Sequence, residues 1–197
     1  MIQIIIENLS KFYGKKCILK DINLILNNQN IYFLTSANGS GKTTFFKCLL
    51  DETKYKGKII DKNLTYAYLP EKVITPDFVT VIDFLRLYLG IDYKEVDEDL
   101  IDEYLEKFNI FEYKNTYVNK LSKGTKQKVF IIKMILSNAD VYLFDEPLAG
   151  LDFKSRKVFM KFLNELYQRK KIIIVASHYY DEYDLMNKKE IDFNEIS

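Results

Sequence analysis

Apolar and polar residues alternate with a period of two in two stretches near the N-terminus. The first stretch is MIQIIIENLS (residues 1–10), and the second is DINLILNNQN (residues 21–30). Alternation of this kind is typical of strands that have one covered face and one face in water. The two stretches therefore predict a small antiparallel sheet.

Two later runs are continuously apolar and end in polar residues: VYLFDEP (141–147) and KIIIVASH (171–178). Such runs are typical of central parallel strands that are buried on both faces. In the segment between them, apolar residues recur at a four-residue spacing at Val158, Phe162 and Leu166. That spacing predicts a helix that covers the sheet, so the pattern indicates a doubly wound α/β core.

The middle of the chain has a helical pattern. Apolar residues recur with a helical period in two segments, TVIDFLRLYL (80–89) and VDEDLIDEYLEKFNIF (96–111). In the second segment, Leu100, Tyr104 and Phe108 fall on one stripe. We therefore expect two amphipathic helices here. The simplest arrangement is a helical subdomain inserted into the α/β core.

Composition excludes several classes of protein. The 197 residues carry 29 Lys and Arg against 28 Asp and Glu, a formal charge of +1, so nothing favours nucleic acid as a partner. Two cysteines, Cys17 and Cys48, are too few for a disulfide framework and fit a reducing cytosol. With no apolar run of the roughly 18 residues that a membrane span needs, we expect a chain that is neither exported nor membrane-spanning by itself.

A glycine-rich loop follows the short apolar run NIYFLTS, and the helical segment TTFFKCLLD follows the loop. The sequence FLTSANGSGKTT (33–44) matches the phosphate-binding pattern G-x-x-x-x-G-K-[ST], except that Ser36 replaces the first glycine. Lys42 is expected to neutralise the β- and γ-phosphates of a nucleotide, and the Thr43 hydroxyl to bind Mg²⁺. The residues predicted to contact the nucleotide here are Ser36, Ala37, Asn38, Gly39, Ser40, Gly41, Lys42, Thr43 and Thr44.

Two carboxylates end the apolar run VYLFDEP. Asp145 falls at the exposed carboxyl end of a buried strand, where it can hold the Mg²⁺ shell, and Glu146 is placed to orient or deprotonate an attacking water. A buried strand capped by acids is weak support by itself. Together with the phosphate loop, it predicts a nucleotide-hydrolysing site.

A third motif, LSKGTKQKV (121–129), completes a resemblance. With it, the sequence resembles the ATP-binding subunits of ABC transporters over nearly the whole chain, from about Ile2 to Tyr183. The motif is similar to the family's signature, with Ser122 and Gly124 in place, and with Lys123 and Thr125 where Gly and Gln are usual. In the family this segment reaches across a dimer to the γ-phosphate held by the other subunit. Taken alone, the motif is equally compatible with an ordinary capped helix start.

The resemblance assigns roles to four further residues. Asp152 in LAGLD matches the acid of the D-loop, which crosses the dimer interface, and Tyr13 matches the aromatic residue that stacks on adenine. His178, the only histidine, matches the switch histidine that contacts the γ-phosphate and Glu146. Glu71 stands where the family has the Q-loop glutamine, and its carboxylate is expected to reach the Mg²⁺ shell. The implied catalytic set is Glu146, His178 and Lys42.

The resemblance also implies the organisation of the chain. It predicts an α/β fold with a P-loop NTPase core of mostly parallel sheet, an antiparallel β subdomain and an inserted helical subdomain. We expect a single ABC ATPase domain over residues 1–197. The catalytic core would comprise 1–70 and 126–197, and the helical subdomain about 71–125, with the Q-loop and signature motif.

The function implied is an ATPase that uses ATP and Mg²⁺ to power a separate integral membrane permease. The partners expected are a second ATPase subunit, identical or not, and the permease, with no nucleic acid. The location expected is cytoplasmic, on the inner face of the cell membrane. The sequence of the signature motif favours an exporter. So does the short C-terminal segment, because it leaves little room for a regulatory domain.

Two other functions remain open. A soluble ABC-type ATPase of translation, DNA repair or metal-cluster assembly would share these motifs, although the chain has one cassette and no heptad run. A nucleotide-responsive binding module that barely hydrolyses ATP would fit the replaced residues Ser36 and Glu71.

Overall fold

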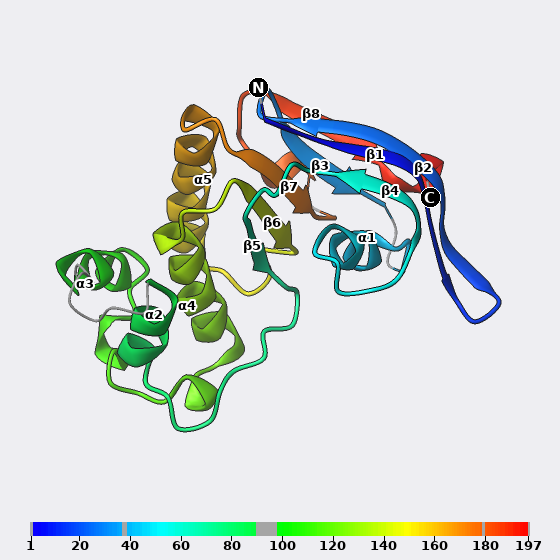
Figure 1. Ribbon diagram of the computed structural model, residues 1–197. Helices are drawn as coiled ribbons and strands as arrows, with labels where there is room; N and C mark the ends of the chain where they lie inside the picture. Colours follow the sequence, from blue (N-terminus) through cyan, green and yellow to red (C-terminus); the bar gives the residue numbers. More distant parts are fainter. Residues whose placement is uncertain (1, 37–38, 90–97, 179, 197) are drawn as a thin grey trace. The chain divides into compact units, whose positions relative to one another are not determined.

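The computed structural model describes residues 2–36, 39–89, 98–178 and 180–196. The chain packs into two compact units (Figure 1). The first unit comprises Met1–Tyr68, Ala139–Glu146 and Leu163–Ser197, and the second comprises Leu69–Asn138 and Pro147–Phe162. Within the described residues, no helix combines the length and the apolar character that crossing a membrane requires.

An antiparallel sheet of three strands opens the first unit, as the alternating N-terminal pattern predicts. Its order is β2-β1-β4, with β1 at Gln3–Tyr13, β2 at Lys16–Asn27 and β4 at Lys56–Ile60. The pairing of β1 with β4 ends at Ser10 and Lys56, so the tip of the β1–β2 hairpin extends beyond the third strand (Figure 1).

A second sheet of five strands has the order β5-β6-β7-β3-β8. Strand β3 runs parallel to both β7 and β8, and β6 runs parallel to β7. Every residue of β6 and β7 is buried, which confirms the prediction of central strands covered on both faces. The strand bounds are Ile31–Thr35 for β3, Tyr66–Leu69 for β5, Val141–Asp145 for β6, Ile172–Ala176 for β7 and Lys188–Asp192 for β8.

The core of the first unit joins both sheets. Helix α1 (Lys42–Leu49) contributes Phe45 and Phe46, which are fully buried with apolar residues of β1, β2, β3, β6 and β7 in one cluster. Burying a phenylalanine contributes about 1.5–3 kcal/mol, so α1 is firmly held. This packing fixes the start of α1, where the phosphate loop ends. A 3₁₀ turn (Tyr180–Glu182) and a short helix α6 (Phe193–Ile196) complete the unit.

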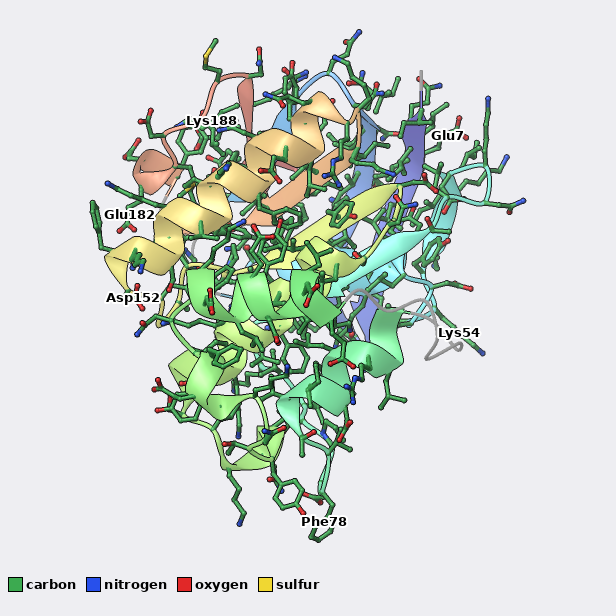
Figure 2. The ribbon with its side chains drawn as sticks, turned by 90° about the vertical axis from the view of Figure 1, so that its left-hand side faces the viewer. Glu7, Lys54, Phe78, Asp152, Glu182 and Lys188 are labelled. Atoms are coloured by element: carbon green, nitrogen blue, oxygen red, sulfur yellow. The ribbon has the colours of Figure 1, made fainter. Side chains whose placement is uncertain are left out.

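Helices dominate the second unit. They are α2 (Val81–Leu89), α3 (Glu98–Lys107), α4 (Lys123–Leu136), the first part of α5 (Phe153–Gln168), and 3₁₀ turns at Phe111–Tyr113 and Val118–Lys120. Phe84 of α2 packs on Phe130 of α4, with ring centroids 5.0 Å apart. In the loop before α2, Phe78 projects from the ribbon and is 84% exposed (Figure 2).

The buried stripe of α3 differs from the sequence prediction. Ile101, Leu105 and Phe108 are fully buried, whereas Leu100 is 37% exposed. The spacing of four and then three residues keeps these side chains on one helical face, and Leu100 lies beside that face. The second unit is also larger than the expected subdomain at 71–125, because α4 and the start of α5 pack within it.

Candidate active site

The parallel sheet of the first unit gathers polar residues at one edge. Strands β3, β6 and β7 are parallel, so their carboxyl ends meet at the same edge. Ser36 follows β3, Asp145 ends β6, and His178 follows β7 after one residue. The N–H of Ser177 donates to the carbonyl of Leu34 at 3.2 Å, which fixes the end of β7 against the end of β3.

The phosphate loop leads from β3 into α1. Gly41 precedes the helix with φ +103°, a conformation that disfavours other residues, and a Cβ there would lie 2.8 Å from Leu19 Cδ2. Lys42 is buried, and its Nζ donates to both the carbonyl and the hydroxyl oxygen of Ser36 at 3.0 Å. The Ser36 hydroxyl also hydrogen-bonds to that of Ser40. The serine at the family's glycine position thus takes part in the loop's hydrogen bonding.

Thr43 and Asp145 place oxygen ligands side by side. The Thr43 hydroxyl donates to Asp145 Oδ2 at 2.6 Å, and Asp145 is only 2% exposed. Tyr68 donates a long hydrogen bond of 3.5 Å to the same oxygen. Hydroxyl and carboxylate oxygens are the ligands that Mg²⁺ prefers, and it completes its shell with phosphates and water. This pair of side chains therefore fits Mg²⁺ bound together with a nucleotide.

Glu146 and His178 face each other at the same edge. Their Oε1 and Nε2 atoms are 3.4 Å apart, and the two side chains are 14% and 31% exposed. The N–H of Glu146 donates to the carbonyl of Ala176 at 2.9 Å, and its φ of +49° is a left-handed conformation uncommon for glutamate. Backbone held in this way is found where a side chain must point in one direction. A carboxylate with a neighbouring imidazole can orient a water molecule and accept its proton.

In the second unit, Ser122 caps helix α4. Its Oγ accepts the N–H of Thr125 at 3.1 Å, and the two hydroxyls hydrogen-bond at 2.8 Å. Ser122 and the following Lys123 are exposed. An exposed hydroxyl at the N-terminus of a 14-residue helix is suited to receive an anion from outside the chain.

The segment after β6 packs on the start of α4. A Cβ on Gly124 would lie 2.8 Å from the carbonyl oxygen of Gly150, so no larger residue fits without moving the backbone. Lys128 Nζ lies 2.6 Å from Asp152 Oδ2, beside the start of α5 (Figure 2). The hydrogen bond from Lys128 lowers the pKa of Asp152 to about 2, with a further bond from the Ser155 N–H. The signature and D-loop segments are therefore held together within this unit.

The predicted site residues divide between the units. The first unit brings together Ser36, Lys42, Thr43, Asp145, Glu146 and His178, with Gly39, Ser40, Gly41 and Thr44 in the same loop and helix start and Tyr13 on the hairpin. Glu71, Ser122, Lys123, Gly124 and Asp152 belong to the second unit, where Glu71 is exposed. Ala37 and Asn38 lie outside the described residues. The roles of all these residues stay predictions.

Sequence reasoning missed several residues that contact the predicted set. Tyr68 reaches Asp145 because β5 neighbours β6, an order of strands that periodicity does not reveal. Thr125 was noted only as a departure from the family, yet its hydroxyl contacts Ser122. Lys128, which pairs with Asp152, stands four residues after Gly124 in the helix, where the repeated lysines of KGTKQK gave no signal to distinguish it.

Comparison with known proteins shows the family of this chain. The family model described as ABC transporter matches residues 19–149, well over half of the chain. The manganese transport system ATP-binding protein MntB of Halalkalibacterium halodurans is 28% identical, spanning 98% of this chain and 86% of the relative. The zinc import ATP-binding protein ZnuC of Rickettsia conorii is 33% identical, spanning 86% of this chain and 72% of the relative.

A solved structure of the ATP-binding subunit of an ABC transporter has the same fold. It has a TM-score of 0.84 at 21% identity and spans 98% of this chain and 87% of its own. The expected fold class, a P-loop NTPase core with a separate antiparallel sheet, is thereby confirmed. The expectation of an exporter finds no support, since ZnuC is named as an importer. The chain belongs to the ABC transporter family, within which it is an ATP-binding subunit.

Proposed function

We propose that this chain hydrolyses ATP with Mg²⁺ and so powers transport through a separate membrane permease. One observation carries the proposal: the Glu146 carboxylate faces His178 at the sheet edge that also holds Lys42 and the Thr43–Asp145 pair. A base, a switch imidazole, a phosphate-binding cation and metal ligands then lie in one unit. This is the set of groups that phosphoryl transfer to water requires.

The chemistry follows from where these groups lie. Lys42, which donates to Ser36 in this structure, turns its ammonium to the β- and γ-phosphate oxygens when ATP binds. Water attacks the γ-phosphorus, Glu146 accepts the water proton, and the bond to the ADP oxygen breaks, leaving ADP and phosphate. Mg²⁺ held near Thr43 and Asp145 would neutralise charge on the phosphates. His178 orients Glu146 and contacts the γ-phosphate.

A second ATPase subunit completes the site in this proposal. The exposed Ser122 hydroxyl at the start of α4 suits an anion presented by another chain. Two subunits would therefore hold two ATP molecules, each between one chain's phosphate loop and the other's signature segment. Hydrolysis then separates the subunits and moves the attached permease. We place the pair at the inner face of the cell membrane, where the permease binds it.

Uptake is the direction that we propose, in place of the export expected from sequence. The support comes from relatives that span most of the chain: MntB is named for manganese transport and ZnuC for zinc import. A divalent transition-metal cation is therefore the first substrate to test. The cargo is bound by the permease and not by this chain, so the motifs of the ATPase do not encode it.

Phosphate release tests the hydrolysis. With Mg-ATP, the rate of phosphate release per chain should rise as the protein concentration rises, because a larger fraction of the chains then forms dimers. Glu146→Gln should slow release by about 10²- to 10⁴-fold and leave ATP binding intact. Glu52→Gln, a change at an exposed carboxylate, is the matched control. Rapid release by Glu146→Gln would contradict the role of Glu146, and the absence of a product burst in the wild type would favour a binding module.

Affinity purification of Glu146→Gln from detergent-solubilised membranes, with ATP and Mg²⁺, tests the partner. Recovery of a stoichiometric polytopic membrane protein is the expected result, and recovery of soluble proteins alone would favour a soluble ATPase. Direction is tested by radioactive manganese and zinc in cells that lack the chain. Reduced accumulation is expected, and increased accumulation would indicate export.

A further inference from the structure

Lys11 is a buried lysine two residues before Tyr13. It is 6% exposed, and its ammonium donates to the Thr53 hydroxyl and to the Lys54 carbonyl, both at 2.6 Å. Within the described part of the chain, no carboxylate forms an ion pair with it. Burial of a cation without an opposite charge is costly, so the position of this ammonium calls for an explanation.

The third neighbour of the ammonium is an aromatic ring. Lys11 Nζ lies 4.5 Å from the centroid of the Tyr13 ring. The two residues are two apart on β1 and so point to the same face of the sheet. Tyr13 is 49% exposed, so about half of this residue is accessible to a ligand. A cation over one face of a ring is attracted by the ring's electrons and holds the ring in place.

The Tyr13 ring lies at the end of the hairpin. Tyr13 ends β1, past the last pairing with β4 at Ser10 and Lys56, so among the described residues no third strand pairs with this end of β1. The pairing with β2 also shifts here, because Lys11 faces Leu19 whereas Phe12 faces Cys17. The extra residue, Ile18, lies on β2, and an irregularity of this kind bends the strand that carries it.

Lys11 connects this hairpin tip to the nucleotide loop. Its acceptors, Thr53 and Lys54, belong to the segment that follows α1, the helix that the phosphate loop begins (Figure 2). On the facing strand, Leu19, the partner of Lys11, packs against Gly41 of the loop. All these residues lie in the first unit. The ammonium thus fixes the Tyr13 ring relative to the residues that hold the phosphates.

We propose that Lys11 is a positioning residue for recognition of the adenine base. It holds one face of the Tyr13 ring, so that the other face is already oriented for stacking when the nucleotide arrives. Fixing the ring beforehand removes part of the ordering cost from the binding step. The inference rests on the proposed nucleotide site, and on the stacking role that the family resemblance gives to Tyr13.

The test is the affinity for ADP, measured by calorimetry on purified chain with Mg²⁺. Lys11→Met keeps the apolar stem and removes the ammonium, and it should weaken ADP binding by about three- to tenfold. The matched control is Lys56→Met, because Lys56 lies over the neighbouring Phe12 ring at 5.4 Å and should leave affinity unchanged. Equal affinity for ADP in Lys11→Met and the wild type would overturn the proposal.

A double-mutant cycle with Tyr13→Ala separates positioning from general stability. If Lys11 acts through the ring, Lys11→Met adds no further loss of affinity once Tyr13 is alanine, although it still lowers the melting temperature. Additive losses would overturn the proposal. If Tyr13→Ala itself leaves ADP affinity unchanged while phosphate release proceeds, adenine stacking fails and the proposal with it, but the proposed ATPase stands.

A base-free ligand and a milder variant complete the design. Lys11→Met should weaken ADP binding but leave the affinity for pyrophosphate unchanged, because only ADP carries a base that can stack on the Tyr13 ring, whereas a general structural defect would weaken both. If Lys11→Met fails to fold, Thr53→Val removes one acceptor of the ammonium and leaves Lys11 in place. It should weaken ADP binding in the same direction by about twofold, and no change there would count against the proposal.

Discussion

The two units assemble their functional residues in different ways. In the first unit, parallel strands bring together residues that are distant in sequence: Thr43 meets Asp145, 102 positions later. In the second unit, the exposed Ser122 is held by Thr125, three residues along the same helix. Sheet topology therefore gathers the residues of the proposed nucleotide site within one unit. Local capping leaves an exposed hydroxyl at the start of α4, which in the proposal receives an anion from a second subunit.

The departures from the family pattern follow the same division. In the first unit Ser36 replaces a glycine, but its hydroxyl and carbonyl both accept from Lys42. In the second unit Lys123, Thr125 and Glu71 replace residues of the signature and the Q-loop. Lys123 adds an exposed positive charge beside Ser122. Ser36 is therefore hydrogen-bonded within the predicted phosphate loop, while Lys123 changes the charge of the surface that is proposed to face a partner.

Loss of the Lys42 ammonium should produce the largest effect on nucleotide binding. This effect should be confined to the first unit. Lys42→Met removes a cation from the phosphates, and hydrogen bonds to charged groups contribute about 1.5–3 kcal/mol each. ATP and ADP binding should therefore weaken by about a hundredfold or more, as measured by calorimetry. Lys47→Met, an exposed lysine on the same helix, is the control. Tight ADP binding by Lys42→Met would show that Lys42 and its loop do not bind the phosphates.

A methyl group at Gly124 should lower ATPase turnover, which needs both units, without changing ADP affinity, which needs only the first. Gly124→Ala places a Cβ 2.8 Å from the Gly150 carbonyl oxygen and must displace the D-loop segment. Overpacking of this kind costs about 1–3 kcal/mol, so ATPase turnover should fall by about ten- to hundredfold. ADP affinity of the single chain should stay unchanged, because the first unit is untouched.

The measurement for Gly124→Ala combines it with Glu146→Gln. Sedimentation with Mg-ATP should show dimers for Glu146→Gln alone and single chains for the double variant. Lys126→Ala, in the same turn of α4, controls for a general effect on the helix. Dimers of the double variant at the same ATP concentration would show that the signature segment does not contact the partner's nucleotide.

Much of the first unit could be predicted from sequence, for a physical reason. Strand periodicity, the glycine-rich loop and the acids after VYLFDEP are local patterns, and parallel strands necessarily align their carboxyl ends. That rule places Asp145 at the same edge of the sheet as the phosphate loop. The sequence does not state the lateral order of strands, so the contact of Tyr68 with Asp145 could not be foreseen.

The second unit was less predictable, because its contacts depend on packing and not on period. Of the stripe expected at Leu100, Tyr104 and Phe108, only Phe108 is buried as expected; the other buried positions are Ile101 and Leu105, since a spacing of four describes a helical face only approximately. The close approach of Gly124 to Gly150 joins segments that no local pattern connects. Motif matching located the signature residues but not the side chains that hold them.

A moderate effect is expected at Thr125. Thr125→Val keeps the β-branched shape and the N–H that Ser122 caps, and removes only the hydroxyl that contacts Ser122 Oγ. A hydrogen bond of this type contributes about 0.5–1.5 kcal/mol, so turnover should fall by about two- to tenfold. Thr125→Ser should restore it, and ADP affinity should not change. Equal turnover by Thr125→Val would mean that Ser122 needs no help from this hydroxyl.

The smallest effect concerns the ion pair of Lys128 with Asp152. The pKa of Asp152 is lowered from 3.8 to about 2, so the charged form stabilises the folded second unit. That contribution is present above about pH 4 and is lost as the pH falls toward 2. Asp152 is 54% exposed, and exposed pairs contribute about 1 kcal/mol or less, so the change in melting temperature should be small.

Titration of Asp152 by carboxyl NMR in Lys128→Met measures this pair directly. The pKa should rise toward its ordinary value but not reach it, because the N–H of Ser155 still donates to Asp152 Oδ1 at 2.8 Å. Lys126→Met, on the same helix, should leave the Asp152 titration unchanged. If Lys128→Met also left the Asp152 titration unchanged, the D-loop segment would be held on α4 by other contacts, such as Gly124–Gly150 and the hydrogen bond from Gln127 to the Pro147 carbonyl, and acid would not loosen it. A raised pKa of Asp152 together with unchanged ADP affinity would instead show that Lys128 acts on the D-loop segment of the second unit and not on the proposed nucleotide site.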